Sequence, residues 1–93
     1  MIDKLDGATV LMLSEKGNYG YIKIQDSQCK DIGVCYLAIC KYDGSEKIYL
    51  FLCDENMNVE NDWDCDSIEE AVSCAQNRAE PQIVWTHTNF IDS

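Results

Sequence analysis

Acidic side chains concentrate in one short part of this 93-residue chain. Of its 17 Asp and Glu residues, eight lie between positions 53 and 70, where no Lys or Arg occurs: Asp54, Glu55, Glu60, Asp62, Asp64, Asp66, Glu69 and Glu70. We call residues 53–70 the acidic segment. Carboxylates at this density can ligate a divalent cation, take part in acid–base catalysis or attract a basic partner.

Calcium binding is the most specific of these possibilities. Asp54, Asn56 and Asn58 have the spacing of the first three ligands of an EF-hand loop. However, Val59 occupies the sixth position, where glycine is required, and Cys65 occupies the twelfth, where a bidentate Glu is required. A second start, eight residues later, fails at the same two positions. We therefore expect no metal and no other cofactor.

Catalysis lacks its usual sequence signals. The one histidine, His87, lies near the C-terminus, and no local motif pairs it with a cysteine. The five glycines are scattered among turn residues and form no phosphate-binding loop. The carboxylates of the acidic segment are expected to be exposed and of ordinary acidity, unlike tuned acids or bases. We expect that the protein is not an enzyme.

The six cysteines could form a disulfide framework, bind zinc or remain reduced. No two are spaced as Cys-x-x-Cys, the spacing that zinc sites usually require. Several lie inside apolar runs, where a free cysteine behaves as a small hydrophobic residue. We expect reduced, structural thiols at all six positions: Cys29, Cys35, Cys40, Cys53, Cys65 and Cys74.

Charge and length restrict the class of protein further. The formal net charge of −10 argues against nucleic acid and anionic membranes as partners and favours a basic protein. Charged residues interrupt the N-terminal region at Asp3, Lys4 and Asp6, and no apolar run has the length of a signal peptide core or a membrane span. We expect a cytoplasmic protein in which residues 1–93 form a single domain.

The apolar residues predict the elements that carry the acidic segment. Residues 8–14 and 19–25 are expected to form one β-hairpin, and residues 34–41 and 47–53 a second, around Asp43-Gly44. Ser67 and Glu70 form a capping box that begins a helix ending before Pro81. Residues 82–87 are expected to form a last strand, and the acidic residues before Ser67 a linker.

The order β-β-β-β-α-β predicts an α+β fold. It consists of an antiparallel sheet of four to five strands with one helix packed on one face. A single helix leaves the second face of the sheet uncovered, and this face is expected to carry tyrosines such as Tyr19 and Tyr21, together with Tyr36 or Tyr49.

Trp63 lies between Asp62 and Asp64 and allows two interpretations. It is either a buried core residue or an exposed anchor at the centre of a charged patch, a composition typical of binding hot spots.

The segment YLFLCDENMNVENDWDCDSIEEAVSCAQ resembles a pattern of small acidic immunity proteins from bacterial toxin–immunity systems of the contact-dependent growth-inhibition type. The matching parts are the apolar strand, CDEN, the acidic linker and SIEEA opening a helix, with Trp85 shortly afterwards. The resemblance implies a protein that binds one cognate toxin domain, often a nuclease, and blocks it in the cytosol. It implies no catalytic residues.

These observations favour a cytosolic immunity-type protein that neutralises a basic toxin domain, with a nuclease the favoured kind, through an acidic surface. The partner-binding residues are expected to be Trp63 and the eight carboxylates of the acidic segment. Two alternatives stay open: a nucleic-acid mimic that inhibits a DNA-binding enzyme, and a small metal- or thiol-dependent enzyme.

Overall fold

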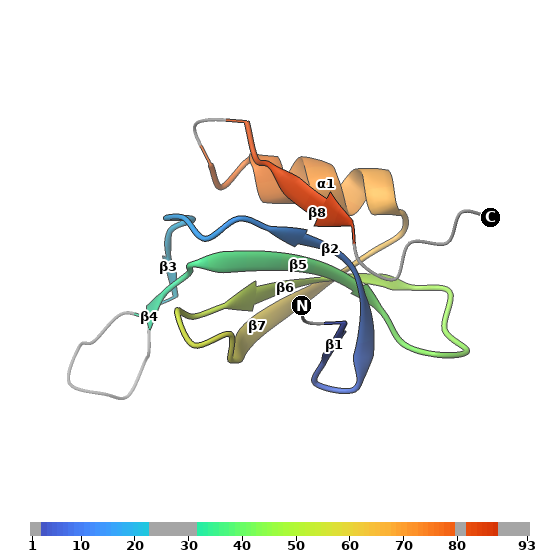
Figure 1. Cartoon of the computed structure of the whole chain (residues 1–93). Helices are drawn as coiled ribbons and strands as arrows, with labels where there is room; N and C mark the ends of the chain where they lie inside the picture. Colours follow the sequence, from blue (N-terminus) through green and yellow to red (C-terminus); the bar gives the residue numbers. More distant parts are fainter. Residues whose placement is uncertain (1–2, 23–31, 80–81, 88–93) are drawn as a thin grey trace.

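A computed structural model describes residues 3–22, 32–79 and 82–87 (Figure 1). In chain order its elements are β1 Lys4–Leu5, β2 Ala8–Ser14, β3 Tyr21–Ile22, β4 Ile32–Gly33, β5 Tyr36–Lys41, β6 Ile48–Cys53, β7 Val59–Cys65, α1 Ile68–Gln76 and β8 Trp85–His87. Among the described residues, no helix is long and apolar enough to cross a membrane.

The main sheet is antiparallel and has the order β1-β2-β5-β6-β7, with β8 also paired to β2. The strands β3 and β4 form a separate two-stranded sheet. The helix α1 covers one face of the main sheet (Figure 1). The predicted α+β class, an antiparallel sheet with one helix on one face, is confirmed.

The hairpin predicted for residues 34–41 and 47–53 is present as β5 and β6. Their register runs from Tyr36 opposite Cys53 to Cys40 opposite Tyr49. Gly44 has a φ of 80° in the connecting turn, a conformation that favours glycine. The continuous apolar sequence of both strands agrees with their burial on both faces.

The hairpin predicted for residues 8–14 and 19–25 is wrong in the part that the structure describes. The strand β2 pairs with β5 and β8, and Tyr21 and Ile22 pair with Gly33 and Ile32. Residues 23–25 lie outside the described residues. The physical reason is burial, because β5 offers β2 a fully buried run from Leu37 to Cys40. This distant pairing removes more apolar surface from water than the local hairpin could.

The linker predicted between the second hairpin and the helix is also wrong. Residues Val59–Cys65 form strand β7, antiparallel to β6, with Leu50 opposite Trp63 and Ile48 opposite Cys65. Trp63 and Cys65 alternate with charged residues, which is the period-two pattern of a half-buried strand. The high acidic content of the segment concealed this pattern.

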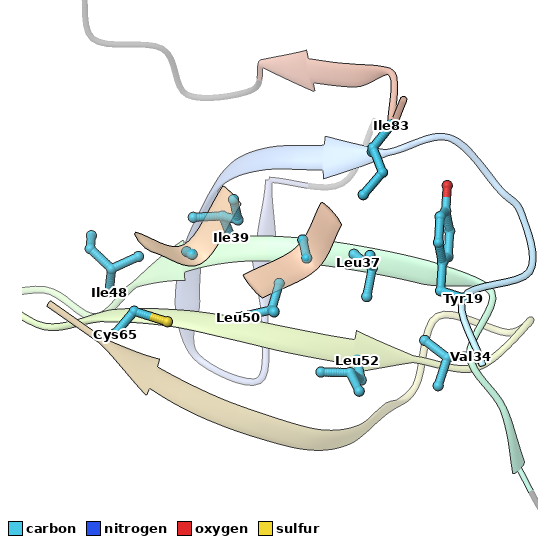
Figure 2. Close-up of a cluster of buried hydrophobic side chains, with 11 residues drawn as sticks. Tyr19, Val34, Leu37, Ile39, Ile48, Leu50, Leu52, Cys65 and Ile83 are labelled. Carbon is cyan, nitrogen blue, oxygen red and sulfur yellow. The ribbon is translucent and has the colours of Figure 1, made fainter. Parts of the chain in front are cut away.

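Apolar side chains pack between α1 and the sheet to form the first core. Figure 2 shows side chains of β5 and β6 pointing into this layer, together with Cys65 from β7 and Ile83 from the segment before β8. The helix brings two fully buried alanines, which allow it to approach the sheet closely. The central residues are Leu37, Ile39, Leu50, Leu52, Ala71 and Ala75.

A second core covers the other face, which the sequence analysis expected to be uncovered. The register of β2 shifts between Val10 and Met12, and the strand bends there. Its first half and β1 lie on the side of the sheet away from α1 (Figure 1). This second core consists of Leu5, Ala8, Val10, Ala38, Cys40, Phe51 and Cys53.

Two of the tyrosines expected on the second face, Tyr19 and Tyr21, lie elsewhere. Tyr19 is buried in the core beside α1, where its hydroxyl donates to the carbonyl of Glu15 at 2.7 Å. Tyr21 is 63% exposed in β3. Tyr36 and Tyr49, which were also named for this face, do pack against the second core, and Tyr42 joins them.

The capping box begins the helix at the predicted residue. Ser67 is extended, with φ −154°, and its Oγ accepts from the N–H of Glu70 at 3.0 Å. The carboxylate of Glu70 accepts from the N–H of Asp66 at 2.7 Å, one residue before the N–H expected from the motif. The two bonds satisfy one donor inside the helix and one just before it.

Candidate functional site

The strand β7 forms one edge of the main sheet. In the part of the chain that the structure describes, it pairs with β6 alone. Residues 60–64 are all exposed. At the opposite edge, β1 and β8 pair with successive parts of β2. The acidic segment therefore holds a seven-residue strand with one open side.

The register of β7 separates its side chains between the two faces of the sheet. Asp62 lies opposite Phe51 and Asp64 opposite Tyr49, on the face away from the helix. Trp63 lies opposite Leu50, on the face that carries α1. Trp63 is thus not the centre of a carboxylate patch, because its two acidic neighbours point to the other side.

Trp63 is neither a fully buried core residue nor an isolated anchor. Its side chain is 40% exposed, and the guanidinium carbon of Arg78 lies 5.5 Å from the ring centroid. The Nε of Arg78 donates to the carbonyl of Tyr19 at 3.0 Å, and burial lowers the pKa of this arginine. The cation–π contact joins the edge strand to the end of the helix and contributes about 0.5–1 kcal/mol.

Three aspartates form what we call the acidic row: Asp62 and Asp64 on β7, and Asp66 immediately after it. Lys47 donates to Asp66 at 3.0 Å and lies 3.8 Å from Asp64. The hydrogen bond to Asp66, with the charges of both aspartates, raises the pKa of Lys47. Among the described residues, no cation lies within 4.0 Å of the Asp62 carboxylate. The row keeps a negative excess.

Aromatic rings border the acidic row. Tyr42 and Tyr49 pack edge to face with centroids 5.3 Å apart, and Phe51 lies 6.4 Å from each of them. Partial burial raises the pKa of the Tyr42 hydroxyl, and the nearby charges of Asp6 and Asp62 raise it further. Half-buried tyrosines beside carboxylates can receive a cationic side chain through ring and charge together.

The Asp54 carboxylate is used inside its own turn. It accepts from the N–H of Asn56 at 2.9 Å, and from the N–H and side-chain amide of Asn58 at 2.8 and 3.1 Å. These bonds, above all that from the backbone of Asn58, lower the pKa of Asp54. Met57 completes the turn with a φ of 67°. The Asp-x-Asn-x-Asn spacing that resembles a calcium loop is thus explained by turn chemistry.

The other predicted site residues lie on either side of the acidic row. Glu60 is exposed where the β6–β7 register shifts, and desolvation raises its pKa, with further contributions from the hydrogen bond and charge of Asp54. Glu55 is exposed in the preceding turn. Glu69 and Glu70 are exposed in the first turn of α1, where Glu70 serves the capping box. Four of the predicted carboxylates therefore lie outside the acidic row, in the turn before β7, at its start or in the first turn of α1: Asp54, Glu60, Glu69 and Glu70.

Lys47 is a site residue that the sequence analysis missed. It lies outside the acidic segment, in the turn before β6, but the hairpin brings it against Asp64 and Asp66. In the antiparallel register of β6 and β7, the residue before Ile48 lies opposite the residue after Cys65. Once β7 is recognised as a strand, this register places Lys47 opposite Asp66.

Three buried thiols show little capacity for nucleophilic chemistry. The five described cysteines are free, and Cys29 lies outside the described residues. Burial raises the pKa of Cys40 and of Cys53 to about 12, and that of Cys65 to about 11. At neutral pH these three thiols are almost fully protonated, whereas the thiolate is the reactive form. His87 is the last residue of β8, opposite Met12.

The chain matches no protein-family profile, no curated protein and no solved structure. Among the described residues, no group of three or more His, Cys, Asp or Glu side chains is placed to hold a metal ion. The acidic row, its aromatic border and the open edge of β7 are the candidate features of this surface.

Proposed function

We propose that the protein is an immunity-type inhibitor that acts in the cytosol, where it binds a basic toxin domain, a nuclease, and neutralises it. The observation that carries this proposal is the acidic row, in which Asp62 and Asp64 lie on one face of an exposed edge strand and Asp66 follows the strand directly. The resemblance of the acidic segment to immunity proteins supports the same function.

Electrostatics gives the proposal its physical basis. A nuclease holds the phosphate backbone with Lys and Arg, so its substrate surface is basic. A chain with a net charge of −10 is attracted to such a surface, and complementary charge raises the association rate by steering. Self-repulsion among the carboxylates works against the fold, so a function in binding gives this arrangement a reason.

The border of the acidic row supplies the other half of a binding surface. Charged rim residues mainly affect association, whereas aromatic residues in the centre of an interface hold the complex together. Tyr42 and Tyr49 are half-buried and pack against each other, which keeps them rigid and lowers the entropic cost of ordering them. We assign the row to steering and the two tyrosines to retention of the partner.

The test is co-purification from the native host with two matched variants. The protein is immobilised as wild type, as Asp62→Lys/Asp64→Lys, and as a control with the same charge change outside β7, Glu15→Lys/Asp43→Lys. All four positions are exposed, so each variant is expected to fold. The proposal expects a basic protein retained by wild type and by the control, and lost from the β7 variant.

A retained protein must then be inhibited. The proposal expects it to cleave nucleic acid, and expects wild type to suppress this cleavage more strongly than the β7 variant does. Equal retention by wild type and the β7 variant would refute the role of the acidic row. A retained DNA-binding enzyme without toxicity, displaced by duplex DNA, would favour the nucleic-acid mimic instead.

A further inference from the structure

The open edge of β7 offers backbone groups as well as charge. In an antiparallel ladder every second residue directs its N–H and C=O away from the paired strand. Because β7 pairs with β6 alone among the described residues, its other alternate groups face outward over a strand of seven residues. The N–H of Asp62 donates to the side-chain Oδ1 of Asn61 at 2.9 Å, a local bond that an added strand would replace. An extended peptide can add to such an edge, with main-chain hydrogen bonds supplying affinity and side chains supplying specificity.

The side chains of β7 restrict which strand can add. A second copy of this chain would place another acidic β7 against the first, and like charges directly opposite each other are destabilising. Charged residues on edge strands are a known means of preventing such self-pairing. The same charges favour a strand that carries Lys or Arg at the facing positions.

The alternation of β7 defines the pattern of the added strand. Residues opposite Asp62 and Asp64 would lie on the face away from α1, the face that also carries Tyr49. The residue between them would lie beside Trp63, on the face of the sheet that α1 covers, where an apolar side chain fits. A shift by one residue would place basic side chains beside Trp63 and Arg78 and is disfavoured.

From this geometry we infer that β7 accepts the basic partner as an additional β-strand, whose side chains are basic opposite Asp62, apolar opposite Trp63 and basic opposite Asp64. This inference rests on the proposed function, because it states how the acidic surface holds its basic partner. It differs from docking on the acidic face alone, since it requires backbone hydrogen bonds as well as charge.

The experiment uses the full chain and synthetic peptides as probes. The parent probe is acetyl-Lys-Val-Lys-Val-Lys-Val-Lys-amide, and a peptide of the same composition with its lysines adjacent is the control. Two further peptides carry N-methyl groups, one on its lysine amides and the other on its valine amides. Kd is measured by titration calorimetry at low salt, and amide exchange of β7 by NMR.

Strand addition requires that one methylated peptide binds like the parent and that the other binds about tenfold or more weakly, since only one set of amides faces β7. It also requires that the adjacent-lysine control binds more weakly than the parent, and that alternate amides within residues 61–65 gain protection from exchange. Amides of β5, already inside the sheet, should not change.

Equal binding of both methylated peptides would overturn strand addition. The proposed function would stand, because charge alone would then account for the binding. Failure of the parent peptide to bind at millimolar concentration would also overturn strand addition. The proposed function fails only on the separate co-purification with Asp62→Lys/Asp64→Lys, so the two outcomes can be distinguished.

Discussion

Replacing Trp63 with alanine tests the position that the structure gives this residue. Truncation of a fully buried Trp costs about 3–5 kcal/mol of unfolding free energy. The side chain is 40% exposed, so roughly three-fifths of that loss applies, about 2–3 kcal/mol. Loss of the contact with Arg78 is part of this sum and contributes about 0.5–1 kcal/mol.

The assay is urea unfolding followed by circular dichroism, with thermal unfolding as a second measurement. For a chain of this size, 1 kcal/mol corresponds to a shift of about 4–8 °C in Tm, so Trp63→Ala is expected to lower Tm by roughly 10–20 °C. Trp63→Phe, which keeps a ring against the helix side of the sheet, should lose less than half as much.

A double-mutant cycle isolates the cation–π contact. Arg78→Gln removes the guanidinium and also its hydrogen bond to the Tyr19 carbonyl. Combined with Trp63→Ala, it should show a coupling of about 0.5–1 kcal/mol. A loss below about 0.5 kcal/mol for Trp63→Ala would show that the ring is not packed, and the register of β7 would be refuted with it.

The remaining predictions concern the helix, the thiols and the charges of β7. Ser67→Ala should lower the unfolding free energy by about 1 kcal/mol in urea denaturation, whereas Ser67→Asp keeps the acceptor and should be nearly neutral. Thiol titration of freshly purified, denatured protein should find all six cysteines free, with a Tm that reductant does not change. The pKa of Glu60 is raised, so its ionisation opposes folding; Glu60→Gln should be more stable than wild type at pH 7, and the gain should disappear as unfolding is measured below about pH 4, where the carboxyl is protonated in both states. In sedimentation velocity, Asp62→Thr/Asp64→Thr should self-associate more than wild type, while Asp62→Lys/Asp64→Lys should not. Equal self-association of the two variants would show that charge does not prevent pairing at this edge.

Local signals predicted the elements that local interactions stabilise. The hairpin of β5 and β6 has two apolar strands and an Asp-Gly turn next to each other in the sequence. The helix has its capping box, in which Ser67 and Glu70 act within a single turn. The hairpin and the start of the helix were expected close to where they lie, because everything that determines them lies within a few positions. The helix ends at Gln76, before Arg78, which was expected in its last turn.

Non-local pairing explains what the sequence could not show. The choice of β5 and β8 as partners of β2 depends on residues more than twenty positions away, and no local pattern encodes it. The placement of Trp63 apart from Asp62 and Asp64 depends on β7 being a strand. Its alternation was present in the sequence, but the acidic composition indicated a solvated linker instead.

The position of β7 gives a physical reason for the concentration of acids in one fifth of the chain. An exposed edge strand is a template for unwanted pairing, and charge is one of the means by which proteins protect it. Charges of either sign would protect the edge strand from pairing, and residues of alternating sign would repel each other less than a row of carboxylates does. Under the proposed function, a row of one sign in a chain that already carries −10 does more, because it repels acidic edges and attracts basic ones. The same three aspartates can therefore keep the protein from associating with itself and direct it to a basic partner, which links the stability of the sheet to the proposed function.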